Sequence, residues 1–371
     1  MRICIDVQSA VTQRAGVGRY TRDLVQHLAD AAPDDDIILA YFDFKSNGSP
    51  LDVTGTEERC IRWCPGRLAQ LAWKTIKWPS FDAFAGEADL YHFPNFIIPP
   101  LRQGKAVVTI HDMAFLRYPH FTENRNARHL KACMQDTVKR ADAIITVSQF
   151  SADEVCDLLD VRPETVFAVH SGISDGFSKP SEENMQRILA EAKLDKPYIL
   201  TVGTVEPRKN IPFLIDVFEQ LNDFDGELVI AGGLGWKYDP ILNRIRNSTR
   251  ANDIHYIEYA SDDLLPSLYA GASAFLLTSF YEGFGFPPVE AMACGTPVVS
   301  SSGGSLAEVL GDAAIVLDDF DCDLWVEKTM QALTDSSLRE DLTSKGYAKA
   351  KSYSWTNTAK ETHAVYERVL Q

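Results

Sequence analysis

Residues 279–301 read SFYEGFGFPPVEAMACGTPVVSS, and this segment carries the strongest structural and functional signal in the chain. It places Glu282 and Glu290 with seven residues between them, around a Gly-Phe-Gly-Phe-Pro-Pro loop. The two prolines favour the first turn of a short helix, and Gly295 favours its end. The segment therefore predicts Glu282 in a bare, flexible loop and Glu290 in or near the first helical turn.

The chemistry of this segment suits a phosphorylated sugar ligand. Free amides at a helix N-terminus, here those of Phe284, Gly285 and Phe286, bind anions such as phosphate. A glutamate can accept two hydroxyl hydrogen bonds, and in this way it can hold the diol of a ribose or a hexose. Taken singly, each glutamate would more often be an ordinary acid, exposed in a loop or placed in a first turn where it favours the helix dipole. Together with the glycines and prolines, the pair predicts a nucleotide-sugar site.

A basic pair lies in the motif Glu-Pro-Arg-Lys-Asn at 206–210. We expect Arg208 and Lys209 to begin a helix over 210–221, directly after a strand. Cations at a helix N-terminus oppose its dipole, so we infer that a bound anion neutralises them. An arginine can grip a diphosphate through two parallel hydrogen bonds, and a lysine acts as a point charge. The alternative is a pair of solvated first-turn charges.

Composition limits the class of protein. The 371 residues fit two domains of ordinary size, and 45% hydrophobic with 24% charged residues is typical of a soluble globular chain. The net charge of −16 argues against a nucleic-acid partner. We expect no signal peptide, no membrane-spanning segment and, from seven scattered cysteines, no disulfide framework. These features predict a reduced, cytoplasmic protein.

Short β-rich runs alternate with amphipathic helical stretches throughout the chain, which is typical of an α/β protein with parallel sheets. A polar stretch at 174–197 is the expected domain boundary. The first predicted sheet comprises residues 2–7, 36–42, 106–110, 143–147 and 165–170. The second comprises residues 198–202, 227–231, 254–259, 274–278, 297–300 and 314–317.

The motifs and their order resemble the retaining glycosyltransferases of family 4. Along the chain these motifs are Gly16-Val17-Gly18, His111-Asp112, Arg208-Lys209, Gly232-Gly233 and the two glutamates. The resemblance spans most of the chain and implies a GT-B fold, with two Rossmann-like domains whose sheets face a cleft. It implies an acceptor domain over 1–180, a donor domain over 190–355, and a C-terminal helix over 356–371 that packs back on the first domain.

The resemblance also implies roles for the residues of the second domain. Arg208 and Lys209 would grip the donor diphosphate and stabilise its charge as it leaves. Glu290 would hold the ribose hydroxyls, and Glu282 would lie beside the transferred sugar. The loop residues Gly283, Phe284 and Gly285 would offer backbone groups to the hexose. The base would be framed, largely through backbone groups, by Gly232, Tyr256 and Ile257.

In the first domain the resemblance implies that His111 contacts the donor sugar, without acting as a proton shuttle. Gly16 and Gly18 would let the diphosphate or the sugar approach the backbone, and Arg14 or Arg19 could add charge. The family further implies a front-face reaction in which the leaving phosphate takes the acceptor proton. The glutamate loop and residues 232–239, GGLGWKYD, resemble bacterial mannosyltransferases that use GDP-mannose.

Three alternatives compete with this interpretation. A dinucleotide site at the first glycine loop is disfavoured because Thr21 occupies the place of the third glycine. A metal-dependent enzyme would use an Asp-x-Asp pair, but all four such pairs, at 34–36, 223–225, 319–321 and 321–323, fall where turns or helix caps are expected. We therefore expect no metal and no other cofactor. A sugar-nucleotide sensor would not need the intact glutamates and basic pair.

Residues 67–78, RLAQLAWKTIKW, mix apolar and basic side chains within an acidic protein. As a helix, Leu68, Leu71, Ala72 and Thr75 share one face, which favours an ordinary core helix. The alternative is a helix that lies on anionic lipid or meets a lipid-linked acceptor.

The sequence as a whole predicts a hexosyltransferase that moves mannose from GDP-mannose to a hydroxyl of a glycan or lipid-linked saccharide. A cytoplasmic location, with peripheral contact at the inner membrane, is part of this prediction. Transfer from a UDP-hexose, or a nucleotide-sugar epimerase without an acceptor, are the enzymatic alternatives.

Overall fold

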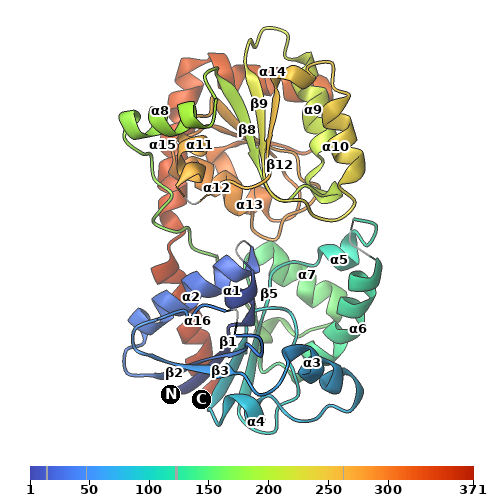
Figure 1. The fold of residues 1–371 in the computed structure, drawn as a ribbon, viewed down its shortest axis with the longest axis vertical. Helices are drawn as coiled ribbons and strands as arrows, with labels where there is room; N and C mark the ends of the chain where they lie inside the picture. Colours follow the sequence, from blue (N-terminus) through green and yellow to red (C-terminus); the bar gives the residue numbers. More distant parts are fainter. Residues whose placement is uncertain (14–15, 47, 122–123, 262) are drawn as a thin grey trace. The chain divides into compact units, whose positions relative to one another are not determined.

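The computed structural model describes residues 1–371 apart from 14–15, 47, 122–123, 262 and the side chains of 124–129. The chain divides into two compact units. Unit 1 comprises Met1–Arg117, Asn124–Gly172 and Ser354–Gln371, and unit 2 comprises Tyr118–Glu123 and Ile173–Tyr353. In Figure 1 unit 1 runs from blue to green and ends with a red helix, while unit 2 runs from green to orange-red.

Unit 1 is built on a seven-stranded parallel sheet with the strand order β3-β2-β1-β4-β5-β6-β7 (Figure 1). Its strands are β1 (Arg2–Asp6), β2 (Asp36–Phe42), β3 (Thr56–Ile61), β4 (Leu90–Phe93), β5 (Lys105–Ile110), β6 (Ala143–Thr146) and β7 (Val166–Ala168). Its helices are α1 (Gln8–Thr12), α2 (Val17–Ala31), α3 (Gly66–Thr75), α4 (Asp82–Ala85), α5 (Ala114–Arg117), α6 (Asn124–Arg140), α7 (Gln149–Leu159), the 3₁₀ turn η1 (Pro163–Thr165) and α16 (Trp355–Leu370).

Successive side chains along each strand of unit 1 point to opposite faces of the sheet, and they form one hydrophobic core on each face. Ile3 and Ile5 of β1 pack with Val25 and Leu28 of α2, whereas Cys4 faces a second cluster that includes Phe81 and Val155. Both faces are therefore covered by helices, as a parallel sheet requires.

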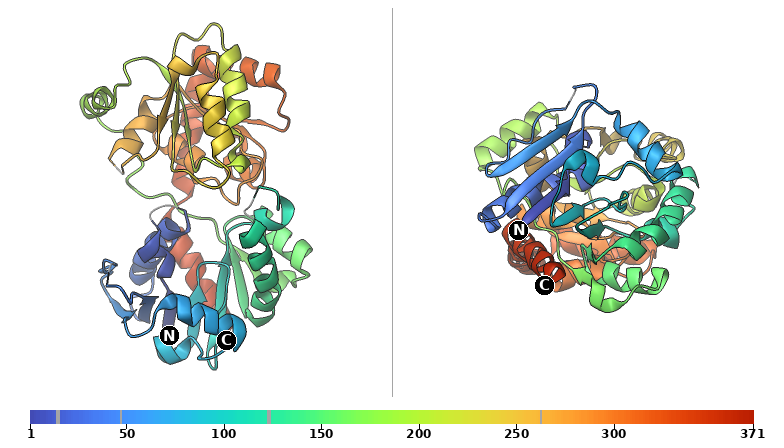
Figure 2. Two further views of the ribbon diagram at one scale, coloured as in Figure 1. Left: turned by 45° about the vertical axis from the view of Figure 1, so that its right-hand side comes forward. Right: turned by 90° about the horizontal axis from the view of Figure 1, so that it is seen from below.

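The last helix, α16, belongs to unit 1. Ala359, Val365 and Tyr366 are part of the core that α2 completes. The buried Tyr366 hydroxyl lies 2.6 Å from Nδ1 of His92, whose Nε2 lies 2.8 Å from the Thr109 hydroxyl. Burial lowers the pKa of His92 to about 3, so its ring is neutral. Both chain ends consequently lie on unit 1 (Figure 2).

Unit 2 contains a six-stranded parallel sheet with the order β10-β9-β8-β11-β12-β13. Its strands are β8 (Tyr198–Val202), β9 (Glu227–Ala231), β10 (Ile254–Ile257), β11 (Ala274–Leu277), β12 (Val298–Ser301) and β13 (Ile315–Leu317). Its helices are α8 (Glu182–Glu191), α9 (Ile211–Gln220), α10 (Asp239–Arg246), α11 (Leu264–Gly271), α12 (Phe286–Ala293), α13 (Leu306–Leu310), α14 (Cys322–Thr334) and α15 (Ser336–Ser352), with the 3₁₀ turns η2 (Pro207–Lys209), η3 (Ala251–Asp253) and η4 (Gly311–Ala313).

These two parallel sheets with interleaved helices confirm the predicted α/β class. Every predicted strand is present, with ends shifted by a few residues at most. Two strands, β3 and β4, were not predicted. The predicted boundary region at 174–197 also contains α8, whose Met185 and Leu189 are buried within unit 2. No helix in the described part of the chain is both long and apolar enough to cross a membrane.

Helix α3 corrects the prediction of an ordinary core helix over residues 67–78. Ala69 is the one fully buried residue of the helix, whereas Leu68 and Leu71 are each 58% exposed. The helix is anchored through Trp73, whose ring packs against Phe42 and whose Nε1 donates a hydrogen bond of 2.6 Å to the Pro79 carbonyl. The predicted apolar face is therefore the exposed one.

A short segment from the N-terminal half of the chain, Tyr118–Phe121, packs within unit 2. The Phe121 ring stacks on Phe280 at 5.0 Å, and the Tyr118 ring meets Tyr281 edge-on at 5.7 Å. Lys237 donates a hydrogen bond of 2.7 Å to the His120 carbonyl. This segment thus covers the residues that directly precede Glu282.

Candidate functional site

The candidate site lies at the carboxyl edge of the unit 2 sheet. Strands β8 and β11 are neighbours, and the strand order runs outward from them in opposite directions. Loops after such a pair meet at a switch point, where ligands bind in open α/β sheets. The Phe280 amide, in the loop after β11, donates a hydrogen bond of 2.9 Å to the Arg208 carbonyl, in the loop after β8. The fold therefore brings the basic pair to the first glutamate.

Arg208 and Lys209 converge on the carboxylate of Glu282. Nη1 of Arg208 lies 2.7 Å from Oε2 of Glu282, and Nζ of Lys209 lies 2.5 Å from Oε1. The Ser279 hydroxyl donates a third hydrogen bond, of 2.6 Å, to Oε1. All three charged side chains are at least four-fifths buried, so this is an interior ion cluster.

A second carboxylate, Glu206, completes the cluster and was missed by the sequence analysis. Its Oε1 accepts hydrogen bonds from Nε and Nη2 of Arg208, at 2.9 and 2.8 Å. Glu206 is only 1% exposed. Its place two residues before Arg208 is the signal that could have identified it, because a buried guanidinium needs carboxylate or carbonyl partners.

The pKa values of the two carboxyl groups, Glu282 and Glu206, are shifted in opposite directions. Burial alone would raise the pKa of Glu282, but the charges of Arg208 and Lys209 and the hydrogen bonds from Lys209 and Ser279 lower it to about 2. Burial raises the pKa of Glu206, and the nearby Glu282 charge adds to that rise. Glu282 is therefore the fixed anion of the cluster.

This cluster corrects two expectations for the basic pair. Arg208 and Lys209 lie in η2, and the following helix begins at Ile211, after Asn210 in the left-handed conformation. The expectation that only a bound anion could neutralise them is also wrong, because Glu206 and Glu282 do so.

The loop around Glu282 is neither bare nor loosely held. The Glu282 amide donates to the Gly303 carbonyl at 3.2 Å, and the Glu282 carbonyl accepts from the Ser305 amide at 2.9 Å. A Cβ on Gly304, where φ is +71°, would lie 2.2 Å from the Glu282 carbonyl oxygen. The glycines after β12, which the sequence analysis did not single out, therefore let the two loops lie backbone to backbone.

Helix α12 follows this loop and carries Glu290. The helix begins at Phe286 with prolines in its first turn, as predicted, but Glu290 is its fifth residue and lies in the second turn. Glu290 is 2% exposed, and its Oε2 accepts a hydrogen bond of 2.7 Å from the Tyr269 hydroxyl. The structure thus holds this carboxylate by a hydrogen bond from α11.

The glycine-phenylalanine loop is less open than predicted. Gly283, Phe284 and Gly285 are all buried, and the Phe284 ring packs edge-on against Tyr353 at 5.2 Å. Gly285 precedes the helix with φ +90°, and a Cβ there would lie 2.6 Å from Leu306. Two of the three residues whose amides were predicted to point outward, Phe284 and Gly285, are therefore buried, and Phe286 is half-buried.

The predicted base-framing residues lie at the ends of β9 and β10. The Tyr256 hydroxyl donates a hydrogen bond of 2.9 Å to the Gly232 carbonyl, and Ile257 follows it at the end of β10. A Cβ on Gly232 would lie 2.0 Å from the carbonyl oxygen of Gly203, after β8. Gly203, also missed from the sequence, leaves room for the Lys209 side chain, which passes 3.1 Å from its Cβ position.

The remaining predicted residues lie together on unit 1. Gly16, with φ +59°, caps α2, and a Cβ at Gly18 would lie 2.1 Å from the Gln13 carbonyl oxygen. Tyr20, one turn on, meets the His111 ring edge-on at 4.7 Å. His111 Nε2 donates to the Pro94 carbonyl at 2.8 Å, and burial lowers its pKa, which keeps the ring neutral. Arg14 lies outside the described residues.

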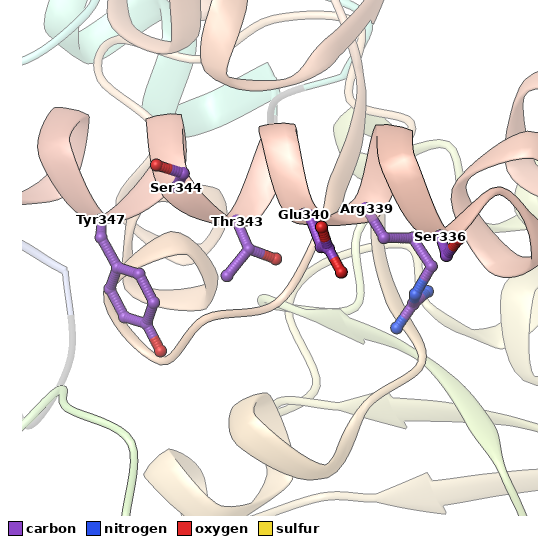
Figure 3. A pocket seen from close by; sticks show the side chains of 6 residues that line it. All are labelled: Ser336, Arg339, Glu340, Thr343, Ser344 and Tyr347. Atoms are coloured by element: carbon purple, nitrogen blue, oxygen red, sulfur yellow. The ribbon is translucent and has the colours of Figure 1, made fainter.

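A groove of about 560 Å³ runs along α15 of unit 2. Figure 3 shows its six lining side chains on one face of that helix. Arg339 Nη1 donates to the Ser273 carbonyl at 2.8 Å, and Thr343 donates to the Gly295 carbonyl at 3.4 Å. These carbonyls precede β11 and β12, so the groove lies at the opposite end of the strands from the ion cluster.

The Asp-x-Asp pairs include one helix cap, as expected. The Asp321 carboxylate accepts a hydrogen bond of 2.9 Å from the Leu324 amide at the start of α14. Within the described residues no group of three His, Cys, Asp or Glu side chains is arranged to hold a metal ion.

Two family descriptions match successive parts of the chain. "Glycosyltransferase Family 4" matches residues 14–176, and "Glycosyl transferases group 1" matches residues 183–349. The chain is 36% identical to the O-antigen chain mannosyltransferase B of Escherichia coli, over 99% of this chain and 100% of that protein. It is 29% identical to the serotype-specific mannosyltransferase WbdA of E. coli, over 78% of this chain and 36% of that longer protein.

Solved structures show the same architecture. Sucrose-phosphate synthase from Thermosynechococcus elongatus superposes with a TM-score of 0.78 over 99% of this chain and 98% of its own, at 18% identity. WaaG, a glycosyltransferase involved in lipopolysaccharide biosynthesis, superposes with a TM-score of 0.73 over 98% of both chains, at 16% identity. The full-length match to a named relative and the two Rossmann-like units establish that the chain belongs to the GT-B glycosyltransferase family and is a glycosyltransferase.

Proposed function

We propose that the protein transfers mannose from GDP-mannose, with retention of anomeric configuration, to a hydroxyl of a glycan or lipid-linked saccharide in O-antigen-type synthesis. The observation that carries this proposal is the buried convergence of Arg208 and Lys209 on Glu282 at the switch point of the unit 2 sheet. The choice of mannose and of the O-antigen product is supported by the name of the full-length E. coli relative.

The cluster suits a leaving group that gains negative charge. A lysine ammonium has three donor hydrogens, so the bond from Lys209 to Glu282 leaves others for a diphosphate. Glu282 holds both cations in one place before the donor binds. Positive groups that are already in position stabilise developing charge without reorganising during the reaction.

Other residues keep their predicted roles as part of this proposal. Glu290 binds the ribose, Phe284 and Gly285 lie by the hexose, and Gly232, Tyr256 and Ile257 frame the base. His111, Gly16 and Gly18 of unit 1 contact the donor sugar or diphosphate. The neutral, hydrogen-bonded ring of His111 suits a sugar contact better than proton transfer. We place the protein in the cytoplasm, where its lipid-linked acceptor is held at the inner membrane.

A donor panel tests the proposal. Purified protein is incubated with GDP-mannose, GDP-fucose, UDP-glucose, UDP-galactose and ADP-glucose, with short mannose oligosaccharides as acceptors. We expect nucleotide release and chain extension with GDP-mannose, and an α-linked product by NMR. Extension from a UDP-hexose alone would contradict the donor assignment, a β-linked product would contradict retention, and donor isomerisation without acceptor would make the protein an epimerase.

Glu290→Ala should weaken the binding of free GDP by about tenfold to a hundredfold. Loss of the carboxylate leaves ribose hydroxyls unpaired in a buried site, which costs roughly 1–3 kcal/mol. Isothermal titration measures the affinity, and Tyr269→Phe is the matched control because it removes the partner of Glu290 but keeps the carboxylate. Unchanged affinity in Glu290→Ala, with lowered thermal stability in both variants, would assign Glu290 a structural role only.

Turnover should survive treatment with EDTA. The basic pair supplies the positive charge that a metal would otherwise bring to the diphosphate, and Asp321 is already used as a helix cap. The assay compares initial rates after EDTA treatment with rates after adding back Mg²⁺ or Mn²⁺. Complete loss that is restored by either ion would overturn this expectation.

A further inference from the structure

Exposed apolar side chains are concentrated in one short stretch of unit 1. The described residues include nine large hydrophobic side chains that are exposed, and five of them lie between residues 63 and 78. Single exposed hydrophobic residues are ordinary on protein surfaces, but a contiguous group marks an interaction site. The five are Trp63 at 71%, Leu68 and Leu71 at 58%, Ile76 at 64% and Trp78 at 67%.

Their exposure does not come from a helix that fails to pack. Ala69 is buried in a small cluster with Ile61 and Phe84, and the Trp73 ring meets Phe84 edge-on at 6.1 Å. Successive helix residues are 100° apart, so Leu68 and Leu71 lie on the side of α3 that turns away from this cluster. The inner face of α3 is thus anchored, and the outer face presents leucines to solvent.

Basic residues are interspersed with these side chains in the sequence. Residues 61–80 contain Arg62, Arg67, Lys74 and Lys77 and no acidic residue, although the whole chain carries a net charge of −16. All four basic residues are exposed. Lys77 lies 3.1 Å from Asp136 of α6, an exposed pair that leaves its charge largely in water. This stretch is therefore a positive, apolar patch on an acidic protein.

We propose that this α3 surface, defined by Arg62, Trp63, Arg67, Leu68, Leu71, Lys74, Ile76, Lys77 and Trp78, binds the anionic phospholipid surface of a membrane. Tryptophan rings favour the boundary between headgroups and acyl chains, and leucines flanked by Lys and Arg are typical of helices that lie in that boundary. Anionic headgroups attract the basic residues. The charge of the rest of the chain repels an anionic bilayer, which leaves this surface as the favoured side of approach.

Sedimentation of the full-length protein with vesicles tests this proposal without any donor or acceptor. We expect binding to vesicles of phosphatidylcholine and phosphatidylglycerol at 3:1, and much weaker binding to phosphatidylcholine alone. Arg67→Glu with Lys74→Glu, and separately Leu68→Ser with Leu71→Ser, should each reduce the bound fraction by about tenfold. All four positions are exposed, so we expect thermal unfolding to be unchanged.

Matched controls separate this surface from general effects of charge and hydrophobicity. Lys351→Glu with Lys360→Glu makes the same charge change at exposed sites, and Tyr259→Ser removes an exposed ring of unit 2. Both controls should bind vesicles as the wild type does. The proposal is overturned if the wild type does not bind anionic vesicles, or if the α3 variants bind as well as the controls. It is also overturned if the α3 variants instead dissociate a dimer in light scattering, which would make the surface an interface between copies.

Discussion

Replacing Lys209 with methionine is expected to lower kcat by about a hundredfold to a thousandfold, the size of effect seen when one preorganised donor is removed from a developing anion. Lys209 is 11% exposed and its ammonium lies 2.5 Å from Glu282, so the unbranched apolar side chain of methionine can occupy nearly the same space. Because the positive charge acts most strongly when the diphosphate leaves, KM for the donor should change much less than kcat.

The measurement is a comparison of initial rates across donor concentrations for the wild type, Lys209→Met and Lys351→Met. Lys351 lies exposed at the end of α15 and serves as the matched control. Arg208→Ala should show a loss of turnover similar to Lys209→Met, together with some loss of stability, because it leaves Glu206 without its guanidinium partner. Turnover equal to that of the Lys351 variant would remove Lys209 from the diphosphate site.

Glu282→Gln is expected to lower the free energy of unfolding by about 3 kcal/mol near neutral pH. The pKa of Glu282 is about 2 in the folded protein, against an ordinary value of 4.5, and each unit of this difference corresponds to about 1.4 kcal/mol. The neutral amide also leaves Arg208 and Lys209 with less of their compensating charge.

The lowered pKa of Glu282 also determines how the free energy of unfolding changes with pH. Because the folded pKa lies below the unfolded one, the stability from Glu282 is fully present above about pH 4.5 and is lost as the pH falls to about 2. Glu206 affects stability in the opposite sense. Its raised pKa means that its charge is unfavourable in the folded protein at neutral pH, and protonation on acidification removes that cost. The difference between wild type and variant should therefore shrink steadily below pH 4.5.

Urea denaturation at several pH values, followed by circular dichroism, measures this difference. Glu361→Gln, on the exposed side of α16, is the control for removing one carboxylate from the surface. A constant difference from pH 7 to pH 2.5, or none at all, would show that the Glu282 cluster does not contribute charge-dependent stability.

Periodicity in the sequence was enough to predict the eleven strands whose residues form clear apolar runs. It missed β3 because TEERCI carries three charged residues, which are tolerated since this strand pairs only with β2 at the sheet edge. It missed β4 because LYHF is short and contains a histidine, which is buried only because Tyr366 and Thr109 satisfy its ring nitrogens. Both strands are stabilised by partners that lie elsewhere in the sequence, and the local pattern does not reveal these partners.

The same limit applies to the candidate site. The spacing of Glu282 and Glu290 and the basic pair predicted where the candidate site lies, but not the ion pairs within it. Whether a carboxylate such as Glu282 is exposed or buried depends on the loop after β12, which is remote in sequence. Helix α3 shows the opposite error. Its apolar pattern predicts that the face with Leu68 and Leu71 is buried, but the helix is anchored through Trp73 and this face is exposed.

The division of the chain has a consequence for its synthesis on the ribosome. All six strands of unit 2 have been made by Leu317, and its last helix is complete by Ser352. The core of unit 1, although most of it is encoded first, still lacks Ala359, Val365 and Tyr366 at that moment. Domains generally fold as their segments emerge, so the second unit can close its core before the first. Until α16 arrives, the nascent chain exposes the apolar surface of α2, β5 and β6 that this helix later covers, and this is the interval in which it most needs protection from aggregation.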